Sequence, residues 1–142
     1  MVESRRDPAQ LVIGSLRSME ARDMASAKAC TAPGSTMQFP GAPSFTDFAE
    51  LIEWSRQRYA SVHKTFDRID VGHRDGTDVV YISGTFSGTW LDNTTFSDIR
   101  YLDCFDIQDG RIMRQVVWND MGEARLARSV STDIPVTRVG AL

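Results

Sequence analysis

The chain is poor in the residues that build cross-linked, metal-bound or membrane-spanning proteins. Its 142 residues include two cysteines and two histidines, too few for a disulfide framework, and none of them has metal-ligand spacing. No apolar run approaches the roughly 20 residues that a helix needs to cross a bilayer. The charged N-terminus has no apolar segment after it, so a secretory signal is not expected. We therefore predict a cytoplasmic protein with reduced thiols and no membrane partner.

The chain also lacks a strong excess of charge of either sign. Sixteen basic against 19 acidic side chains leave a net charge of −3, and the arginines are scattered, so the basic footprint of a nucleic-acid partner is missing. Hydrophobic residues make up 42% of the chain, as in ordinary globular proteins. The length fits one domain, which we expect over residues 1–126, followed by a C-terminal tail over 127–142. Its pattern leaves three states open, which are helical, flexible and docked on a partner.

The first part of the chain carries a helical pattern. Asp7 followed by Pro8 predicts a helix start, because aspartate caps helices and proline fits the first helical position. Asp23 is predicted to cap a short continuation over residues 24–30. The expected buried stripe recurs at helical spacing and consists of Val12, Leu16 and Met19.

A second helix is expected to begin at Ser44, after a short strand over residues 36–39. Its apolar positions keep helical spacing up to residue 62, where the period of the pattern changes to two. The predicted inward side of this helix consists of Phe45, Phe48, Ile52, Ser55, Tyr59 and Val62.

The second half of the chain alternates as strands do. Two glycines on one face of a long predicted strand, Gly84 and Gly88, indicate a sharp bend or bulge. Gln108-Asp109-Gly110 predicts a tight hairpin turn. Helices followed by an antiparallel meander favour an α+β fold over a parallel sheet. The expected strands cover residues 63–71, 78–90, 95–107 and 111–119.

This order of elements resembles the SnoaL-like branch of the nuclear transport factor two-like superfamily, which includes ketosteroid isomerases and polyketide cyclases. The resemblance is carried by the segments 101–112 and 117–122 and by the helix break at 20–23. It implies a cone-shaped, strongly bent antiparallel sheet with N-terminal helices that close a pocket for a small apolar organic molecule. It implies no cofactor, and it is specific for the fold rather than for an activity.

Asp103 is the residue best suited to chemistry. It stands in mid-strand on the same face as Tyr101, Phe105 and Ile107, with no cation close in sequence. Burial there would raise the pKa of its carboxyl group, and a neutral acid can donate a hydrogen bond to a developing enolate oxygen. The resemblance places Asp103 where ketosteroid isomerases carry such an acid. A structural pairing of Asp103 with a tyrosine or an arginine stays open as the alternative.

The rest of the expected pocket offers no proton acceptor. The resemblance puts the general base of the isomerases at Phe39, which cannot accept a proton, so steroid isomerisation by that mechanism is not expected. Counting along the last strand from Gly110 gives further pocket-facing residues, and no metal ligand is among them. The predicted substrate-binding residues are Phe39, Tyr59, Tyr101, Phe105, Met113, Gln115, Val117 and Asn119.

Two functions follow from these residues. One is an acid-assisted isomerase, cyclase or dehydratase that acts on an apolar carbonyl compound, with Asp103 as the donor. The other is a non-catalytic ligand-binding or dimeric interaction module on the same fold, which the missing base favours. The outer face of the last strand carries Ile112, Val116 and Trp118. Such an apolar face needs a partner, so we predict a homodimer through the sheet.

Overall fold

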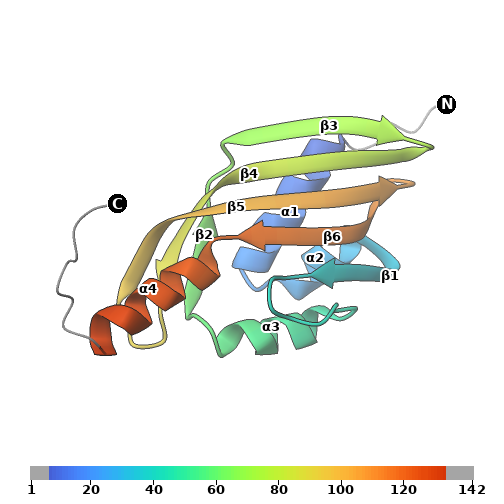
Figure 1. Cartoon of the computed structure of the whole chain (residues 1–142). Helices are drawn as coiled ribbons and strands as arrows, with labels where there is room; N and C mark the ends of the chain where they lie inside the picture. The colour runs from blue at the N-terminus through green and yellow to red at the C-terminus, as the bar shows by residue number, and fades with distance from the viewer. Residues whose placement is uncertain (1–6, 134–142) are drawn as a thin grey trace.

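Within residues 7–133, which the computed structural model describes, the chain forms four helices and one curved six-stranded sheet (Figure 1). Side chains are described up to residue 129. None of the helices in this range is long and apolar enough to cross a membrane. The helices are α1 (Pro8–Glu20), α2 (Met24–Ala29), α3 (Phe48–Arg56) and α4 (Met121–Asp133). The strands are β1 (Thr31–Gln38), β2 (Ser61–Lys64), β3 (Arg68–Arg74), β4 (Thr77–Thr89), β5 (Thr95–Gln108) and β6 (Arg111–Asn119).

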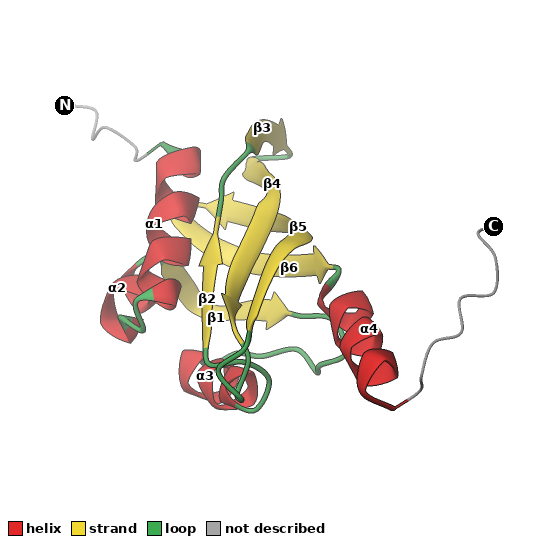
Figure 2. Cartoon of the chain, turned by 90° about the vertical axis from the view of Figure 1, so that its left-hand side faces the viewer, coloured by secondary structure: helices red, strands yellow, loops and turns green. Residues whose placement is uncertain are grey.

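The sheet has the order β1-β6-β5-β4-β2, with β3 also paired to β4. All pairs are antiparallel except β1 and β6, which are parallel. Figure 2 shows α1 and α2 together against one face of the sheet, α3 below its lower end and α4 apart from them, after the end of β6. This strongly curled α+β arrangement confirms the predicted fold class.

The start of α1 forms as predicted. The Asp7 carboxylate accepts a hydrogen bond from the backbone N–H of Ala9 at 3.0 Å, and Pro8 occupies the first turn. Asp23 caps α2 in the same way, because its carboxylate accepts from the backbone N–H of Ser26 at 3.2 Å. Both caps satisfy backbone donors that a helix end leaves without a partner.

The boundaries of β1 and α3 differ from the prediction. Strand β1 begins at Thr31 rather than at residue 36, and a register shift between Thr31 and Thr36 absorbs the intervening Pro33 and Gly34. Helix α3 begins only after Asp47 and ends at Arg56. The predicted helix was too long because pairing of the following residues with β4 outweighs their helical pattern.

The strand predicted over residues 63–71 is two strands. β2 pairs with the later half of β4, and β3 pairs with its earlier half. The glycines of β4 allow the segment 61–65 to approach this strand closely. A Cβ on Gly84 would lie 2.5 Å from the carbonyl oxygen of Thr65, and one on Gly88 would collide with the carbonyl of Ser61. The register shift between Phe86 and Gly88 confirms the predicted bulge.

A second bulge changes the facing of residues on β6. Ile107 pairs with Ile112, whereas Asp106 pairs with Arg114, so Met113 is an extra residue on this strand. Ile112 therefore points into the core and is 3% exposed. The prediction that Ile112 belongs to the outer face was wrong, because the bulge reverses the alternation expected from Gly110.

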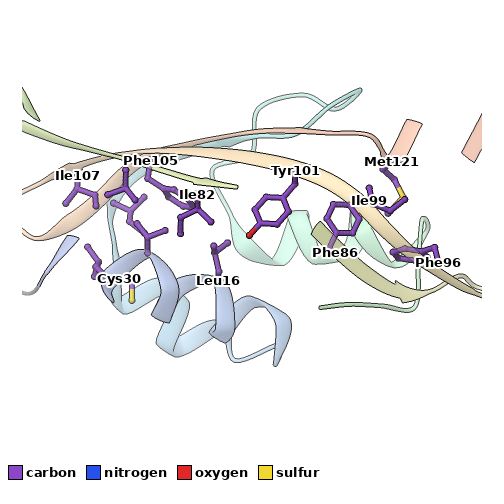
Figure 3. Packing of buried hydrophobic residues seen from close by; sticks show 14 of the residues in the cluster. Leu16, Cys30, Ile82, Phe86, Phe96, Ile99, Tyr101, Phe105, Ile107 and Met121 are labelled. Carbon is purple, nitrogen blue, oxygen red and sulfur yellow. The ribbon is translucent and has the colours of Figure 1, made fainter. Parts of the chain in front are cut away.

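The main core lies between α1 and the concave face of the sheet. Figure 3 shows Leu16 and Cys30 on the helical side opposite Ile82 and Phe105. Toward the other end of the sheet gather Phe86, Phe96, Ile99 and Met121, with Tyr101 between the two groups. A second cluster joins α2, β1 and α3. Residues of both clusters, among them Leu16 and Leu51, also line the cavity described below.

Helix α4 runs across the boundary expected at residue 126. The segment from residue 121 to 133 is one helix, and the remainder of the predicted tail, residues 134–142, lies outside the described residues. Met121 and Ala124 at the start of α4 pack against the main core. This helix is therefore joined to the domain at its first turn.

Candidate functional site: a pocket above a buried ion pair

Two adjoining cavities, together called the pocket here, lie beside α3 and β2. The first has a volume of about 210 Å³ and the second of about 240 Å³, which together suit a small organic molecule. The walls that they share are Phe39, Tyr59, Val62 and Lys64. The first cavity also contacts Leu16, Met19, Glu20, Arg22, Leu51, Ser55 and Gln115, and the second contacts Trp54, Arg58, Phe86, Val117, Asn119 and Met121.

Lys64 carries the charged group at the shared wall. Its ammonium Nζ donates a hydrogen bond to Asp103 Oδ2 at 2.7 Å and lies 4.6 Å from the ring centroid of Tyr101. The side chain of Lys64 is 12% exposed and that of Asp103 is fully buried. Lys64 therefore lines the pocket as one partner of a desolvated ion pair, with Asp103 and the ring of Tyr101 behind it.

The C-terminal end of α1 fixes Lys64 in place. Glu20 Oε1 accepts a hydrogen bond from the backbone N–H of Lys64 at 2.7 Å, and Arg17 donates to the Lys64 carbonyl at 3.1 Å. Glu20 Oε2 lies 2.9 Å from Arg17 Nη1 and 3.2 Å from His63 Nδ1. Because both backbone groups of Lys64 are held by α1, its side chain has a defined direction toward Asp103.

The environment of Asp103 disfavours its charged form. Burial raises the pKa of the carboxyl group, and the Lys64 ammonium and the Gln115 amide oppose that rise. Asp103 Oδ1 has no hydrogen-bond partner of normal geometry within the described residues. The raised pKa agrees with the sequence prediction. The sequence prediction named no cation beside Asp103, and the structure supplies one in space, because Lys64 lies 39 positions away in sequence.

Two tyrosines near the pocket are buried enough to stay neutral. Burial raises the pKa of Tyr59, while the Arg22 charge and a hydrogen bond with Ser55 lower it. Burial and the Asp103 carboxylate raise the pKa of Tyr101, whose hydroxyl donates to the carbonyl of Thr65 at 2.5 Å. Both hydroxyl groups act as neutral hydrogen-bonding groups at ordinary pH.

The predicted site residues divide into two groups. Those that line the pocket are Phe39, Tyr59, Gln115, Val117 and Asn119. The others, Asp103, Tyr101, Phe105 and Met113, are not among the described residues that line it. Asp103 and Tyr101 reach the pocket through Lys64, whereas Phe105 is wholly inside the core. A catalytic role for Asp103 stays a prediction.

Sequence reasoning missed the cations and the acid of the pocket. Lys64 shares the alternation of Val62 on β2, where both are half-buried while Ser61 and His63 are exposed. That alternation was a usable signal, but the predicted strand began at His63, two residues after the start of β2, and so did not include Val62. Glu20 and Arg22 lie at the helix break, where the sequence indicates a turn and not a contact with β2 or α3.

The described residues offer no group of three or more His, Cys, Asp or Glu side chains that could hold a metal ion. What the first cavity does offer is the ammonium of Lys64, the guanidinium of Arg22, the amide of Gln115 and the hydroxyl groups of three residues against apolar walls. Such a set binds oxygen atoms of an organic ligand by hydrogen bonds.

Comparisons of sequence give no relative for this chain: no family model matches it, and no curated protein matches it. Solved structures, in contrast, match over most of its length. An NTF2-like protein of unknown function from Burkholderia pseudomallei has a TM-score of 0.68 at 17% identity, covering 82% of this chain and 92% of its own.

Two further matches come from proteins with named partners or activities. TerC, co-crystallised with polyporic acid, has a TM-score of 0.68 at 14% identity, over 83% of this chain and 95% of its own. A proposed polyketide cyclase from Xanthomonas campestris has a TM-score of 0.61 at 16% identity, over 86% of this chain and 96% of its own. Likeness at these identities speaks for the fold and not for an activity. The chain therefore has the fold of the nuclear transport factor two-like superfamily, as the sequence resemblance predicted.

Proposed function

We propose that the chain binds a small apolar carbonyl compound in the pocket, with the carbonyl oxygen accepting a hydrogen bond from Lys64. The position of Lys64 carries this proposal: the residue lines both cavities, and its side chain is only 12% exposed. An ammonium has three donors, and one of them goes to Asp103. The remaining donors can turn toward a ligand that fills the apolar space.

The same geometry supports acid-assisted isomerisation, cyclisation or dehydration. In each of these reactions negative charge develops on the carbonyl oxygen, and a fixed cationic donor in a dry site stabilises that charge strongly. Asp103 would hold the ammonium in position, as a positioning residue behind Lys64. The likeness to a proposed polyketide cyclase and to a protein crystallised with polyporic acid supports a small organic ligand.

One observation favours binding without turnover. Glu20 is the sole carboxylate among the described residues that line the pocket. Its oxygens already accept from the Lys64 backbone and contact Arg17 and His63, so no free carboxylate is ready to take a proton from a substrate. A non-catalytic ligand-binding module is therefore the second candidate.

A matched pair of ligands tests the proposal. We would titrate the protein with 2-acetylnaphthalene and with 2-ethylnaphthalene, which lacks the carbonyl oxygen, and follow binding by amide NMR. A hydrogen bond to a charged donor is worth about 1.5–3 kcal/mol, so the ketone should bind roughly tenfold or more tightly than the hydrocarbon.

The control is the double variant Lys64→Met/Asp103→Leu, which removes the ion pair without leaving a buried charge. It should bind the two compounds equally. Equal binding to the wild-type protein, or shifts confined to residues outside the pocket, would contradict the proposal.

A further inference from the structure

The turn between α1 and α2 has an arginine where folding alone does not favour one. Arg22 has a φ of 60°, in the left-handed region that L-residues other than asparagine and aspartate seldom adopt. The other described non-glycine residues with positive φ are Asp75, Asn93, Asp98 and Asp109. Arg22 is thus the exception among them, and backbone strain of this kind gathers at binding sites.

Arg22 lies at the wall of the first cavity with little to hold its charge. Its Nη1 is 3.4 Å from Ser55 Oγ, a long hydrogen bond. Among the ion pairs of the described residues, none includes Arg22. The hydroxyl of Tyr59 lies near enough for the Arg22 charge to act on it. Two hydroxyl groups therefore accompany the guanidinium, without a carboxylate.

The other charged groups of the first cavity are compensated. Lys64 faces Asp103 at 2.7 Å, and Glu20 faces Arg17 at 2.9 Å. Among the residues that the structure describes, the positive charge of Arg22 thus has no ion-pair partner at the edge of the first cavity. A guanidinium in this setting suits a carboxylate, which it can bind through two parallel hydrogen bonds.

We propose that the ligand of the pocket carries an anionic group, a carboxylate in the simplest case, which docks on Arg22 while its apolar body extends toward Lys64. This inference rests on the proposed function, because it names the class of molecule that the same pocket takes. Tyr59 places a hydroxyl group beside the guanidinium, so the anion would meet two polar side chains at one end of the cavity. Ser55 Oγ, which donates to the Ile52 carbonyl at 2.8 Å, accepts from Arg22 and helps to hold the guanidinium there. The opposite end, at Lys64, is left for an uncharged oxygen.

The test compares 2-naphthoate with its uncharged amide, 2-naphthamide. Wild-type protein should bind the carboxylate at least tenfold more tightly by isothermal titration calorimetry, with NMR shifts at Arg22, Ser55 and Tyr59. Raising the salt from about 0.01 M to about 1 M should reduce the difference in affinity between the two compounds, because ions screen the charge of the Arg22 guanidinium.

Arg22→Gly separates binding from folding. Glycine adopts a left-handed backbone without strain, so this variant should melt at or above the temperature of the wild-type protein. It should bind the carboxylate and the amide equally, with an unchanged affinity for the amide. Arg56→Gln is the matched control, because Arg56 is an exposed arginine on α3 that lies 3.9 Å from Glu53. That control should keep the full preference.

The outcomes distinguish this inference from the proposed function. Equal binding of the two compounds to the wild-type protein, or a preference that Arg22→Gly retains, would overturn the anionic ligand and leave the carbonyl pocket in place. If neither naphthalene acid nor amide binds, and the ketone pair above also fails, both the pocket function and this inference are overturned.

Discussion

The two faces of β5 carry ion pairs of similar length in opposite surroundings. On the concave face, Asp103 lies 2.7 Å from Lys64, with side chains 0% and 12% exposed. On the convex side, Arg100 Nε lies 2.5 Å from Asp120 Oδ2, with side chains 80% and 38% exposed. Distance alone would rank these pairs as equals. Burial makes their contributions to stability different. Removing one partner of the buried pair leaves a desolvated charge, which is costly, whereas water screens the exposed pair.

The apolar residues of the sheet show the same contrast. Inward-facing residues such as Ile82 and Phe105 are fully buried, whereas Tyr81, Leu102 and Trp118 on the outer face are each more than a third exposed. The concave face thus holds a buried ion pair beside the main core, whereas on the convex face Tyr81, Leu102 and Trp118 form an apolar patch that no described residue covers. We associate the first with ligand binding and the second with assembly.

The largest expected effect comes from breaking the buried pair. Asp103→Leu should lower the free energy of unfolding by about 3–5 kcal/mol, because it strands the Lys64 ammonium in the core. The double variant Lys64→Met/Asp103→Leu should recover most of that loss. Urea unfolding followed by circular dichroism measures both.

The exposed pair provides the comparison for that experiment. Asp120→Asn should change the free energy of unfolding by less than about 1 kcal/mol. If Asp103→Leu costs no more than Asp120→Asn, the contrast between the two faces does not hold.

A pH series sharpens the comparison further. The folded-state pKa of Asp103 is raised, so the folded protein binds this proton more tightly than the unfolded chain, whose aspartate pKa is about 3.9. Stability should therefore fall as pH rises from about 4 through the folded pKa, by at most about 1.4 kcal/mol per pH unit.

The double variant Lys64→Met/Asp103→Leu has no carboxyl group at position 103, so its stability should lack this part of the pH dependence. Thermal and urea unfolding of both proteins from about pH 4 to about pH 8 gives the difference. Parallel curves for the two proteins would show that Asp103 does not titrate in that range.

The convex face should show its role in assembly. We expect a homodimer through the sheet, with Trp118 and Leu102 buried between the two copies. The predicted contribution of Val116 is smaller, since it is already buried within one chain. Light scattering at micromolar concentration should give twice the chain mass for the wild-type protein. Trp118→Arg should give a monomer that is still folded, and a monomeric wild-type protein would contradict this assignment.

The last prediction is that the protein shows no steroid isomerase activity. Phe39 lies in the pocket, at the wall between its two cavities, and a phenyl ring cannot accept a proton. We therefore predict no isomerisation of a β,γ-unsaturated steroid ketone above the rate in buffer, measured by ultraviolet absorbance of the conjugated product. Turnover clearly above buffer would mean that another group in the pocket acts as the base.

Sequence reasoning was most successful where structure is set locally. The alternation along β4, β5 and β6 gave these strands within about one residue, and the turn at Asp109 and Gly110 forms with both residues at positive φ. The caps at Asp7 and Asp23 are local for the same reason.

What the sequence could not reveal depends on contacts between distant segments. The bulge that turns Ile112 inward arises from the register of β5 against β6, which no single-strand pattern contains. The partner of Asp103 comes from β2, and the placement of β2 depends on α1 and on the two glycines of β4. The pattern of a single strand therefore identified Asp103 as a buried acid, but it did not identify Lys64 as the partner of that acid.

One NMR titration tests most directly whether the buried Lys64–Asp103 pair lies directly behind a ligand pocket that Lys64 lines. The carboxyl carbon of Asp103 would be followed from about pH 3 to about pH 9, with and without 2-acetylnaphthalene. We predict a midpoint above the ordinary value of about 3.9 and a change in the Asp103 and Lys64 side-chain signals when the ketone binds. A midpoint at or below that value, with signals unchanged by the ketone, would contradict the claim.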